Sequence, residues 1–456
     1  MADWAEKIGW NCFLLWHIRE DRTIPYLPLE KVMQLQSQRV QRMIRHAYDT
    51  VPYYREVMDL RKLTPSDFRS AEDLAKLPIL TPEQVSRNPR HFRSSLYPDK
   101  RTVAMRSSGT SGRFREIHYD RQSLFLSLAH SYRQRKVMAR IVGNLGGYRE
   151  MVCARPGSIS FTIREFFESY SWIPPRLELK RAFLSSQEPF AANIERLNQF
   201  RPTVLAGYGT YLGALYRYAW EHGLDIHTPG AIRYGGDAMA RGDRELLESH
   251  YQVPVLSGYQ AAEALRIAFQ CERREGFHLS LDLVAVQVID DHGLSLGPGG
   301  QGNLILSNLT NRATVLLNYR QGDVVSLSPA PCPCGRTLPT LSSIDGRSDD
   351  LLVHPEDGHQ LHALGIQSRL HRVKGVIQVQ IVQEALRNFR ISVVCDGLLD
   401  WEETSRELRQ AMSAVFGNQI EVAVERVRQI ALEPSGKVKA AICCCKPSDA
   451  SAQDPG

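Results

Sequence analysis

The sequence lacks long hydrophobic runs and clustered blocks of charge, and these absences exclude several classes of protein. No stretch of the 456 residues approaches the roughly 18–20 consecutive apolar residues that a membrane-spanning helix needs, so we expect no membrane span. The formal net charge of +6 is small for this length, and Lys and Arg do not gather into a face that would bind nucleic acid. The basic group Arg133, Arg135, Lys136 and Arg140 is interpreted as the solvated side of a helix.

The sequence also lacks a secretion signal and a disulfide framework. The N-terminal segment is apolar at Trp4, Trp10 and Trp16, but polar residues interrupt it and no small-residue cleavage site follows. We therefore predict a packed amphipathic helix there, or a contact surface for a partner. Nine cysteines, three of them consecutive at 443–445, do not have the spacing of a disulfide scaffold, so we expect a reduced, cytoplasmic setting.

The length of the chain and its apolar segments predict two domains. At 456 residues, with 43% apolar and 23% charged residues, the chain has an ordinary globular composition and exceeds one average domain. From residue 121 to about 345, short apolar runs alternate with helical stretches, which predicts α/β layers. Strands are expected at 151–154, 253–256, 303–307 and 314–320, with a strand that runs into a loop at 204–209 and a strand that ends in a tight turn at 231–237. Helices are expected at 193–199, 212–221 and from about 240 to 251.

Beyond residue 345 the pattern changes to that of a small α+β unit. Strands are expected at 376–382, 389–395 and 420–427, with a helix from 401 to about 416. The predicted fold class is therefore α/β, with a large N-terminal domain at 1–345 and a small α+β domain at 346–446. The Ser-, Asp- and Pro-rich residues 447–456 are expected to be disordered.

A loop rich in serine and glycine at 107–113 has the composition of an anion-binding site. It reads Ser-Ser-Gly-Thr-Ser-Gly-Arg and lies between strand-like runs at 102–105 and 115–119, which predicts a hairpin. Glycines let backbone N–H groups approach an anion closely and hydroxyl groups add donors, so the loop suits a polyphosphate. It is not the Walker pattern, which has four residues between its first glycine and Gly-Lys and opens a helix. Taken alone, an ordinary Ser/Gly turn is the better explanation.

Other segments fall, together with this loop, in an order that resembles the phenylacetate–CoA ligase and CapK-like family of acyl-adenylate-forming enzymes. They include Leu-Pro-Ile-Leu-Thr at 77–81, Tyr-Arg-Gln-Gly-Asp at 319–323 and Cys-Pro-Cys-Gly-Arg at 332–336. The set is completed by Gly258-Tyr259 with Glu263 and by the segments 46–54, 346–350 and 434–437. Each segment is weak alone, but the ordered set spans roughly residues 40–445. The resemblance implies a large adenylate-forming domain followed by a small mobile lid.

The resemblance implies that ATP and Mg²⁺ activate a small-molecule carboxylic acid, aromatic or arylacetic, as acyl-AMP, which then passes to an acceptor thiol, CoA. It assigns Mg²⁺ to Glu263 and the developing phosphoryl charge to Lys437. Mg²⁺ prefers carboxylate and phosphate oxygens, and a lysine on a glycine-containing loop supplies a point charge to a phosphoryl oxygen. The nucleotide-binding residues implied are Ser107, Ser108, Gly109, Thr110, Ser111, Gly112, Gly236, Asp237, Gly258, Tyr259, Asp323 and Arg347.

Structural roles remain open for several of these residues. Glu263 also fits a charge in the first turn of a helix, Asp323 an aspartate in a Gly-Asp turn, and Lys437 a surface-turn lysine. The resemblance places a hinge at 346–350, where Asp349 is the residue expected to absorb the backbone change.

The acyl pocket is expected at the ends of three neighbouring strands, and its candidate residues are Tyr208, Tyr234, Gly235 and Ser257. Tyrosines at these positions either stack on an aromatic acid or form the wall. The sequence departs from the family at 260–262, which read Gln-Ala-Ala, and at 353–362, where a run that helps to form the thioester is missing. The second departure leaves an amine or a carrier protein open as the acceptor. A non-catalytic nucleotide-binding scaffold is a further alternative.

Cys271, His278, Cys332 and Cys334 carry the remaining chemical pattern. Three thiolates and an imidazole suit tetrahedral structural Zn²⁺, although the spacing is not that of a zinc finger. The resembled family commonly has these residues, and zinc binding is implied for some members. Buried free cysteines with a core histidine are the alternative, and the two stand level. The sequence also leaves open the identity of the acid and whether the protein forms a homodimer.

Overall fold

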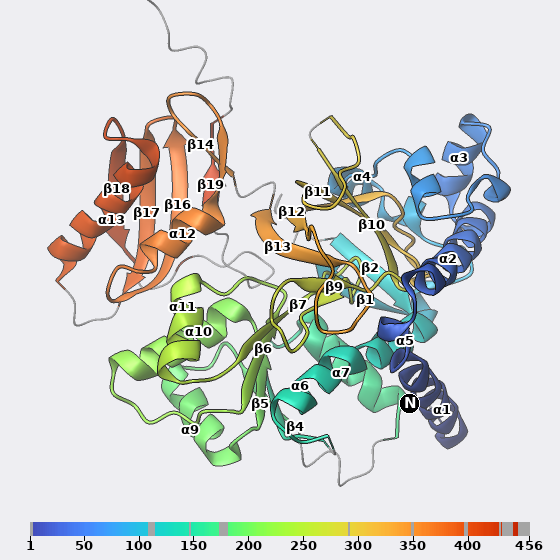
Figure 1. Ribbon diagram of the computed structural model, residues 1–456, viewed down its shortest axis with the longest axis horizontal. Helices are drawn as coiled ribbons and strands as arrows, with labels where there is room; N and C mark the ends of the chain where they lie inside the picture. The colour runs from blue at the N-terminus through green and yellow to red at the C-terminus, as the bar shows by residue number, and fades with distance from the viewer. Residues whose placement is uncertain are drawn as a thin grey trace, which may run out of the picture.

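The computed structural model shows a large N-terminal domain and a smaller C-terminal domain beside it (Figure 1). It describes residues 3–107, 115–145, 147–172, 181–290, 292–347, 351–395, 400–427, 430 and 441–445. Within these ranges helices and strands alternate, and one mixed sheet forms the centre of the N-terminal domain. The predicted α/β class is confirmed.

The central sheet has eleven strands in the described part of the chain, in the order β10-β11-β12-β13-β9-β8-β7-β6-β5-β3-β4. The strands from β4 to β7 run parallel, and the strands from β7 to β10 pair antiparallel. Their bounds are β3 (Glu150–Ala154), β4 (Arg181–Ser185), β5 (Val204–Gly207), β6 (Ala231–Gly235), β7 (Val255–Tyr259), β8 (Ala268–Phe269), β9 (Phe277–Leu279), β10 (Val284–Ile289), β11 (Gln301–Asn308), β12 (Tyr319–Leu327) and β13 (Thr340–Arg347).

Helices connect the parallel strands, because parallel neighbours need a crossover connection. Leu212 and Leu215 of one crossover helix are fully buried against Leu205 and Ile232 of the sheet. The predicted helix at 240–251 begins at Arg241 and changes to a π-helix at 246–250. The α-helices in the described residues of this domain are α1 (Trp4–Asp21), α2 (Leu29–Thr50), α3 (Pro52–Leu60), α4 (Pro82–Arg87), α5 (Arg121–His130), α6 (Tyr132–Ile141), α7 (Ile159–Tyr170), α9 (Phe190–Phe200), α10 (Gly209–Glu221) and α11 (Arg241–Glu245).

The predicted hairpin around the Ser/Gly loop is confirmed. Strands β1 (Thr102–Ser107) and β2 (Arg115–Asp120) pair antiparallel, with Ser107 opposite Arg115 at the end nearest the loop. The buried Ile117 and its neighbours pack into a hydrophobic cluster with α5 and α7. The loop residues 108–114 and the side chain of Ser107 lie outside the described residues, but the base from which the loop leaves is well anchored.

The prediction of a strand at 314–320 is wrong for residues 314–318. Strand β12 begins at Tyr319, and Thr314 makes only an isolated bridge. The backbone of 314–318 instead bonds to scattered partners: Val315 N–H donates to the Phe92 carbonyl, and Leu317 N–H donates to the Tyr54 hydroxyl. The segment is apolar because it is buried in the core, so burial produced a strand-like pattern without a strand.

In its described residues, the C-terminal domain has a four-stranded sheet in the order β18-β17-β16-β19, with two helices packed on it. The predicted strands and the helix at 401–416 are confirmed. The division into domains at 345 and 346 remains a prediction; the central sheet continues to Arg347, and 348–350, which include Asp349, lie outside the described residues. The elements are β14 (Leu351–Val353), β15 (Gln360–His362), α12 (Ala363–Leu370), β16 (Val376–Ala385), β17 (Asn388–Cys395), α13 (Trp401–Phe416), β18 (Glu421–Arg426) and β19 (Ala441–Cys443).

Helix α1 packs one face on the N-terminal domain and exposes the other. Trp10 stacks on Phe125 with ring centroids 4.7 Å apart, whereas Trp4, Leu15 and Trp16 are 69%, 64% and 62% exposed. The predicted packed helix is confirmed, but it is not amphipathic, because large apolar side chains also lie on its exposed face. A contact surface for a partner remains a prediction. None of the helices in the described ranges combines the length and the apolarity needed to cross a bilayer.

The interpretation of Arg133 as part of a solvated helix face is wrong. Its side chain is 2% exposed and donates to Asp282 at 2.8 and 2.9 Å and to Asp21 at 2.6 Å. Asp21 ends α1, and His130 Nδ1 lies 2.6 Å from the same carboxylate. Arg133 therefore joins three distant parts of the chain through buried charges.

Candidate functional site

Glu263 lies beside the base of the Ser/Gly loop, in a fully enclosed polar group. Its side chain is 4% exposed, and Arg115 Nη2, from the first residue of β2, lies 3.7 Å from Glu263 Oε1. Tyr319 donates its hydroxyl to the same oxygen at 3.4 Å and accepts a hydrogen bond from Arg115. The structure thus brings together residues that lie almost 150 and almost 60 positions apart in the chain.

The backbone around Glu263 is held as firmly as its side chain. Asn308 donates its amide to the Glu263 carbonyl at 2.8 Å, and Tyr119 donates its hydroxyl to the Ala262 carbonyl at 2.7 Å. The segment is a bend and not a helix, so the reading of Glu263 as a charge in a first helical turn does not hold. A buried carboxylate is an oxygen ligand of the kind that Mg²⁺ prefers.

Asp323 lies in a β-bulge of β12 and contacts the end of β7. Three residues, Gln321 to Asp323, face the single residue Leu304 of β11, and Gly322 has φ +84°. Such a bulge re-aims a side chain. Tyr259 donates its hydroxyl to the Asp323 carboxylate, and both residues are less than a tenth exposed. In the pairing of β12 with β13, Asp323 is opposite Arg347. The side chain of Arg347 lies outside the described residues.

The carboxyl ends of β5, β6 and β7 lie side by side, as the candidate residues require. Gly207 is opposite Tyr234, Tyr234 is opposite Ser257, and Gly235 is opposite Gly258. Ligands in open α/β sheets gather at such ends. The structure therefore places the strand-end candidates at one edge of the sheet.

Asp237 closes the start of α10. Its carboxylate accepts hydrogen bonds from the N–H groups of Gly209 at 2.6 Å and Thr210 at 3.3 Å. These are donors that have no partner within the helix, and the negative charge also complements the helix dipole. Gly236, at φ +86°, supplies the turn between Asp237 and the strand, and the Tyr208 ring lies next to it. The carboxylate of Asp237 thus orders this edge of the sheet.

The other acyl-pocket candidates are not equally placed to meet a ligand. Tyr234 is buried in the hydrophobic core between the sheet and the crossover helices. It is therefore better placed to form the wall of the acyl pocket than to stack on the acid. Ser257 is 7% exposed, and its backbone N–H donates to Gln270 at 2.7 Å. Gln260 lies against Gly235, where a Cβ atom would be 2.7 Å from the Gln260 amide nitrogen. Arg266 holds that side chain through a 2.8 Å hydrogen bond.

A second buried carboxylate, Glu150, is held at the start of β3. Arg135, Arg181 and Arg233 approach it at 3.7, 3.0 and 3.3 Å. Burial alone would raise the pKa of Glu150, but the three guanidinium groups outweigh burial and lower the pKa to about 2. Part of the basic composition of the chain is therefore used to neutralise internal carboxylates.

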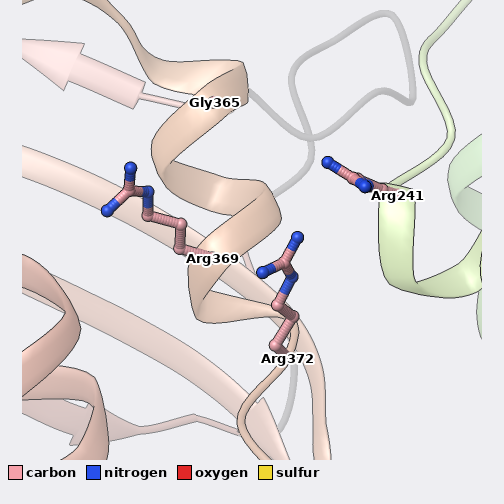
Figure 2. A pocket seen from close by; sticks show the side chains of 4 residues that line it. All are labelled: Arg241, Gly365, Arg369 and Arg372. Carbon is pink, nitrogen blue, oxygen red and sulfur yellow. The ribbon is translucent and has the colours of Figure 1, made fainter.

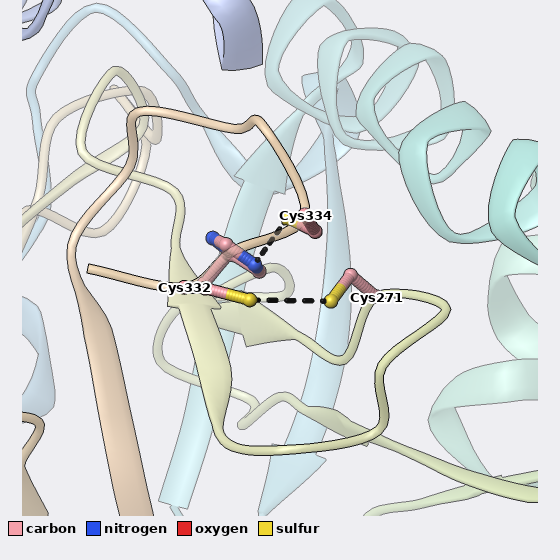
Figure 3. A group of neighbouring side chains, drawn as sticks. Cys271, Cys332 and Cys334 are labelled. Carbon is pink, nitrogen blue, oxygen red and sulfur yellow. Dashed lines mark hydrogen bonds between the residues drawn. The ribbon is translucent and has the colours of Figure 1, made fainter. Parts of the chain in front are cut away.

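Cys271, His278, Cys332 and Cys334 come together in three dimensions. Figure 3 shows the three cysteines of this group. The sulfur atoms of Cys271 and Cys332 are 3.7 Å apart, and Cys334 Sγ is 3.3 Å from His278 Nε2. All four ligand atoms lie within 4.8 Å of one another. The other ring nitrogen, His278 Nδ1, lies 3.1 Å from the Leu338 carbonyl, which fixes the ring with Nε2 toward the cysteines. Burial lowers the pKa of His278 to about 4, so the ring is neutral at pH 7.

Sequence reasoning missed Arg115 and the hydroxyl of Tyr319 as parts of the site. Tyr319 was in a recognised segment, but its neighbour Glu263 is separated from it in sequence. Arg115 occupies an inward position of an alternating strand, and this pattern could have identified it as a buried residue. Three groups of predicted residues lie outside the described parts of the chain: Ser108 to Gly112, Asp349 and Lys437.

Comparisons with known proteins agree with this arrangement. Residues 353–443 match the family described as the CapK C-terminal domain. The phenylacetate-coenzyme A ligase of Thermus thermophilus is 26% identical over 414 residues, which cover 86% of this chain and 85% of that protein. The protein CapK of Staphylococcus aureus is 23% identical over 417 residues, covering 90% and 89%.

The fold also matches a solved structure over most of its length. A crystal structure of 2-hydroxyisobutyryl-CoA ligase in its postadenylation state aligns with a TM-score of 0.72 and 18% identity, covering 92% of this chain and 91% of that one. The fold, the ordered segments and the relatives agree with one another. Residues 353–443 match the CapK C-terminal domain, and over most of its length the chain is similar to phenylacetate–CoA ligases and to CapK.

Proposed function

We propose that this protein is an acyl-adenylate-forming ligase, which activates a carboxylic acid with ATP and passes the acyl group to CoA. The observation that carries the proposal is the position of Glu263, buried beside the hairpin from which the Ser/Gly loop leaves and paired with Arg115 at 3.7 Å. In this arrangement Glu263 would hold Mg²⁺ close to phosphates bound by the Ser/Gly loop. The names of the curated relatives, phenylacetate-coenzyme A ligase among them, support the same activity.

The first step joins the acid to AMP. A carboxylate oxygen of the acid attacks the α-phosphorus of ATP, the bond to the β-phosphate oxygen breaks, and pyrophosphate leaves. Mg²⁺, when bound, neutralises phosphate charge, and Glu263 is the residue assigned to hold it. The loop from Ser107 to Gly112 would hold the β- and γ-phosphates, Asp323 the ribose hydroxyls, and Lys437 the charge that develops on the α-phosphate.

The second step transfers the acyl group. The sulfur of CoA attacks the acyl carbon, its proton leaves, and the bond to AMP breaks to give a thioester. No covalent bond to the protein is needed, so the residues of the chain act by positioning and electrostatics. Tyr259, fixed through its hydroxyl to Asp323, is suited to flank the adenine while Asp323 binds the ribose.

The acid is proposed to be aromatic or arylacetic. The relatives named phenylacetate-coenzyme A ligase support this class. Within the chain, Tyr208, Gly235 and Ser257 lie at the same edge of the sheet, and Tyr208 supplies an aromatic face that is not part of the buried core. The carboxamide of Gln260 lies next to Gly235 and fills the space there.

An amine or a carrier protein is the second candidate acceptor. The specific observation in its favour is the lid segment 353–362, which forms the end of β14, a turn and β15 in place of the run that CoA ligases of the family carry. The adenylation step is common to both candidates. The choice between them therefore rests on the acceptor assay.

We also propose that Cys271, His278, Cys332 and Cys334 bind one structural Zn²⁺ ion. A tetrahedral ion with Zn–S bonds of about 2.3 Å and a Zn–N bond of about 2.05 Å would separate two sulfur atoms by about 3.8 Å and a sulfur from the nitrogen by about 3.5 Å. The observed 3.7 and 3.3 Å fit these values. Four protein ligands leave no open position, so the ion would hold β9 to the segment 332–336 and take no part in catalysis.

A cytoplasmic location is part of the proposal. None of the nine cysteines is paired in a disulfide, although Cys271 and Cys332 are neighbours. Thiols that are kept reduced and available as metal ligands are typical of that compartment.

The test is pyrophosphate release from ATP and Mg²⁺ with a panel of aryl, arylacetic and aliphatic acids. Each acid is run with CoA, with hydroxylamine and with neither. We expect acid-dependent release that Lys437→Ala abolishes and that CoA stimulates. Release with hydroxylamine but without stimulation by CoA would replace CoA with an amine or a carrier protein. No release with any acid, from protein shown to be folded, would refute the ligase assignment.

A further inference from the structure

The face of helix α1 that points away from the protein is apolar. Its exposed apolar residues include Trp4, Ile8, Cys12, Leu15 and Trp16. They recur at every third or fourth position, so they form one stripe along the helix, and both tryptophans and the leucine are more than half exposed. On the opposite side of α1, three side chains pack into the core of the N-terminal domain: Trp10, Phe13 and Leu14. Apolar side chains therefore lie on both sides of this helix, and only one side is covered by described residues.

Two arginines continue this stripe at its C-terminal end. Arg19 follows Leu15 by four residues and Trp16 by three, so it lies on the same face of the helix. Arg22 comes one further turn along, and both arginines are exposed. Among the residues that the structure describes, no acidic side chain forms an ion pair with either of them. Arginine can lay its aliphatic stem along an apolar surface while its charged end reaches a polar phase.

The three acidic side chains of α1 are occupied away from the stripe. Glu6 pairs with Arg121 at 2.6 Å. Asp21 is buried beside Arg133. Glu20 lies 2.9 Å from the ring of a histidine one turn before it. The exposed face of α1 therefore combines apolar surface with positive charge and contains no acidic residue.

A second copy of the chain is a poor match for this face. The two tryptophans, the leucine and the isoleucine expose roughly 400–500 Å² of apolar surface, whereas a stable interface buries about 800 Å² on each partner. A second copy would also present the same stripe, which has arginines and no carboxylate to pair with them. The occupant must instead be apolar and anionic.

We infer that α1 docks the protein on a membrane surface that contains anionic phospholipids. Indole rings favour the boundary between headgroups and acyl chains, leucine and isoleucine enter the acyl region, and arginines meet the lipid phosphates. Trp4 and Trp16 lie about 18 Å apart along the helix axis, so both reach this boundary when the helix lies flat on the membrane. Figure 1 shows α1 at the periphery of the N-terminal domain, on the side away from the C-terminal domain. Docking through α1 thus leaves the C-terminal domain free.

A second basic group of the protein provides a matched control for charge alone. Arg241, Arg369 and Arg372 are exposed on α11 and around the end of α12 (Figure 2). None of the exposed large apolar side chains in the described ranges lies on either helix. If positive charge were sufficient for membrane binding, this group would contribute as much as the arginines of α1.

The test is co-sedimentation of the full chain with vesicles of phosphatidylcholine, with and without about 30% phosphatidylglycerol. The variants are Trp4→Ser/Trp16→Ser and Arg19→Gln/Arg22→Gln, with Trp220→Ser and Arg369→Gln/Arg372→Gln as controls; Trp220 is a 52% exposed tryptophan of α10. We expect binding to the anionic vesicles only, weakened about tenfold or more by each change in α1 and less than about twofold by the controls. All the replaced side chains are exposed, so the melting temperatures should stay alike.

Each contrary outcome identifies a different error. Wild type that binds neither kind of vesicle, or Trp4→Ser/Trp16→Ser that binds like wild type, would overturn the inference. Equal losses from the two arginine pairs would show an attraction of overall charge with no role for α1. Analytical ultracentrifugation is run in parallel: a dimer that Trp4→Ser/Trp16→Ser converts to monomer, without vesicle binding, would assign the face to a second copy. Vesicle binding needs no turnover, so the result is independent of the proposed ligase activity.

Discussion

The ion pair between Arg115 and Glu263 allows the structural and chemical roles of Glu263 to be separated by a double-mutant cycle. Both side chains are 4% exposed, and their charged atoms are 3.7 Å apart. With an effective dielectric constant of about 20, this separation corresponds to an attraction of about 4 kcal/mol. Removing one partner leaves the other charge buried alone, which costs about 3–5 kcal/mol. We expect Glu263→Gln and Arg115→Met each to lower the free energy of unfolding by about 3 kcal/mol.

The double variant Arg115→Met/Glu263→Gln removes both charges. Its loss of free energy of unfolding should therefore be smaller than the sum of the two single losses by about 2–3 kcal/mol. Activity should not return with stability. Because Mg²⁺ is assigned to Glu263, both proteins that carry Glu263→Gln should lack acid-dependent pyrophosphate release, whereas Arg115→Met should keep part of it.

The assay is urea unfolding at pH 7 followed by tryptophan fluorescence, with pyrophosphate release measured on the same preparations. The exposed pair Arg164 and Glu168 of α7, at 2.6 Å, provides a matched cycle whose coupling should stay below about 0.5 kcal/mol. A coupling between positions 115 and 263 no larger than this control would contradict the buried-pair reasoning. Near wild-type pyrophosphate release from Glu263→Gln would contradict the magnesium assignment.

Three further predictions concern other parts of the molecule. Folding lowers the pKa of Glu150 from 4.5 to about 2, so its ionised form contributes about 3 kcal/mol of stability above pH 4.5, which is lost toward pH 2. The difference in free energy of unfolding in urea between wild type and Glu150→Gln should therefore shrink by about 2 kcal/mol between pH 7 and pH 3. A difference that does not change with pH would refute this prediction. Elemental analysis should find one zinc per chain, lost in His278→Asn together with part of the melting temperature; metal-free wild type would contradict the site. Gly235→Ala places a Cβ atom 2.8 Å from the Gly258 carbonyl, so the melting temperature should fall by several degrees, and an unchanged value would show that the strands can separate at no cost.

Elements whose pattern is local were predicted well. The helix Trp401–Phe416 was expected with the same bounds, because its apolar residues recur at helical spacing and Asp400 caps its first N–H groups. The hairpin of β1 and β2 followed from two alternating runs around a glycine-rich loop. In both cases neighbouring residues carried enough information to specify the backbone.

Features that depend on distant partners were not predicted. Arg133 was taken for a surface residue because its neighbours are basic, yet its partners are Asp21 and Asp282. The apolar segment before Tyr319 alternates like a strand, but its hydrogen bonds go to several elements and not to one neighbouring strand. A periodic pattern of apolar residues indicates which residues are buried. It does not indicate which atoms form hydrogen bonds with the backbone, because that depends on the whole fold.

For the candidate site, the sequence indicated which residues to consider but not how they are arranged in space. Glu263, Asp323 and Tyr259 could be selected from the ordered segments. The bulge that aims Asp323 and the guanidinium of Arg115 beside Glu263 could not, because they depend on strand pairings across the sheet. Asp237, predicted to contact the nucleotide, is already used by the N–H groups of α10. The roles of these residues in binding and catalysis remain predictions.

Because the chain is synthesised from its N-terminus, the partners of the buried Arg133 are made at different times. Its two carboxylate partners lie 112 residues before it and 149 residues after it. At about 5–20 residues per second, Asp282 is made about 7–30 s after Arg133. Until then Arg133 can pair with Asp21 but lacks the carboxylate that accepts its other two hydrogen bonds. We therefore expect the packing of α1 against α6 to reach its full stability only after Asp282 has been made.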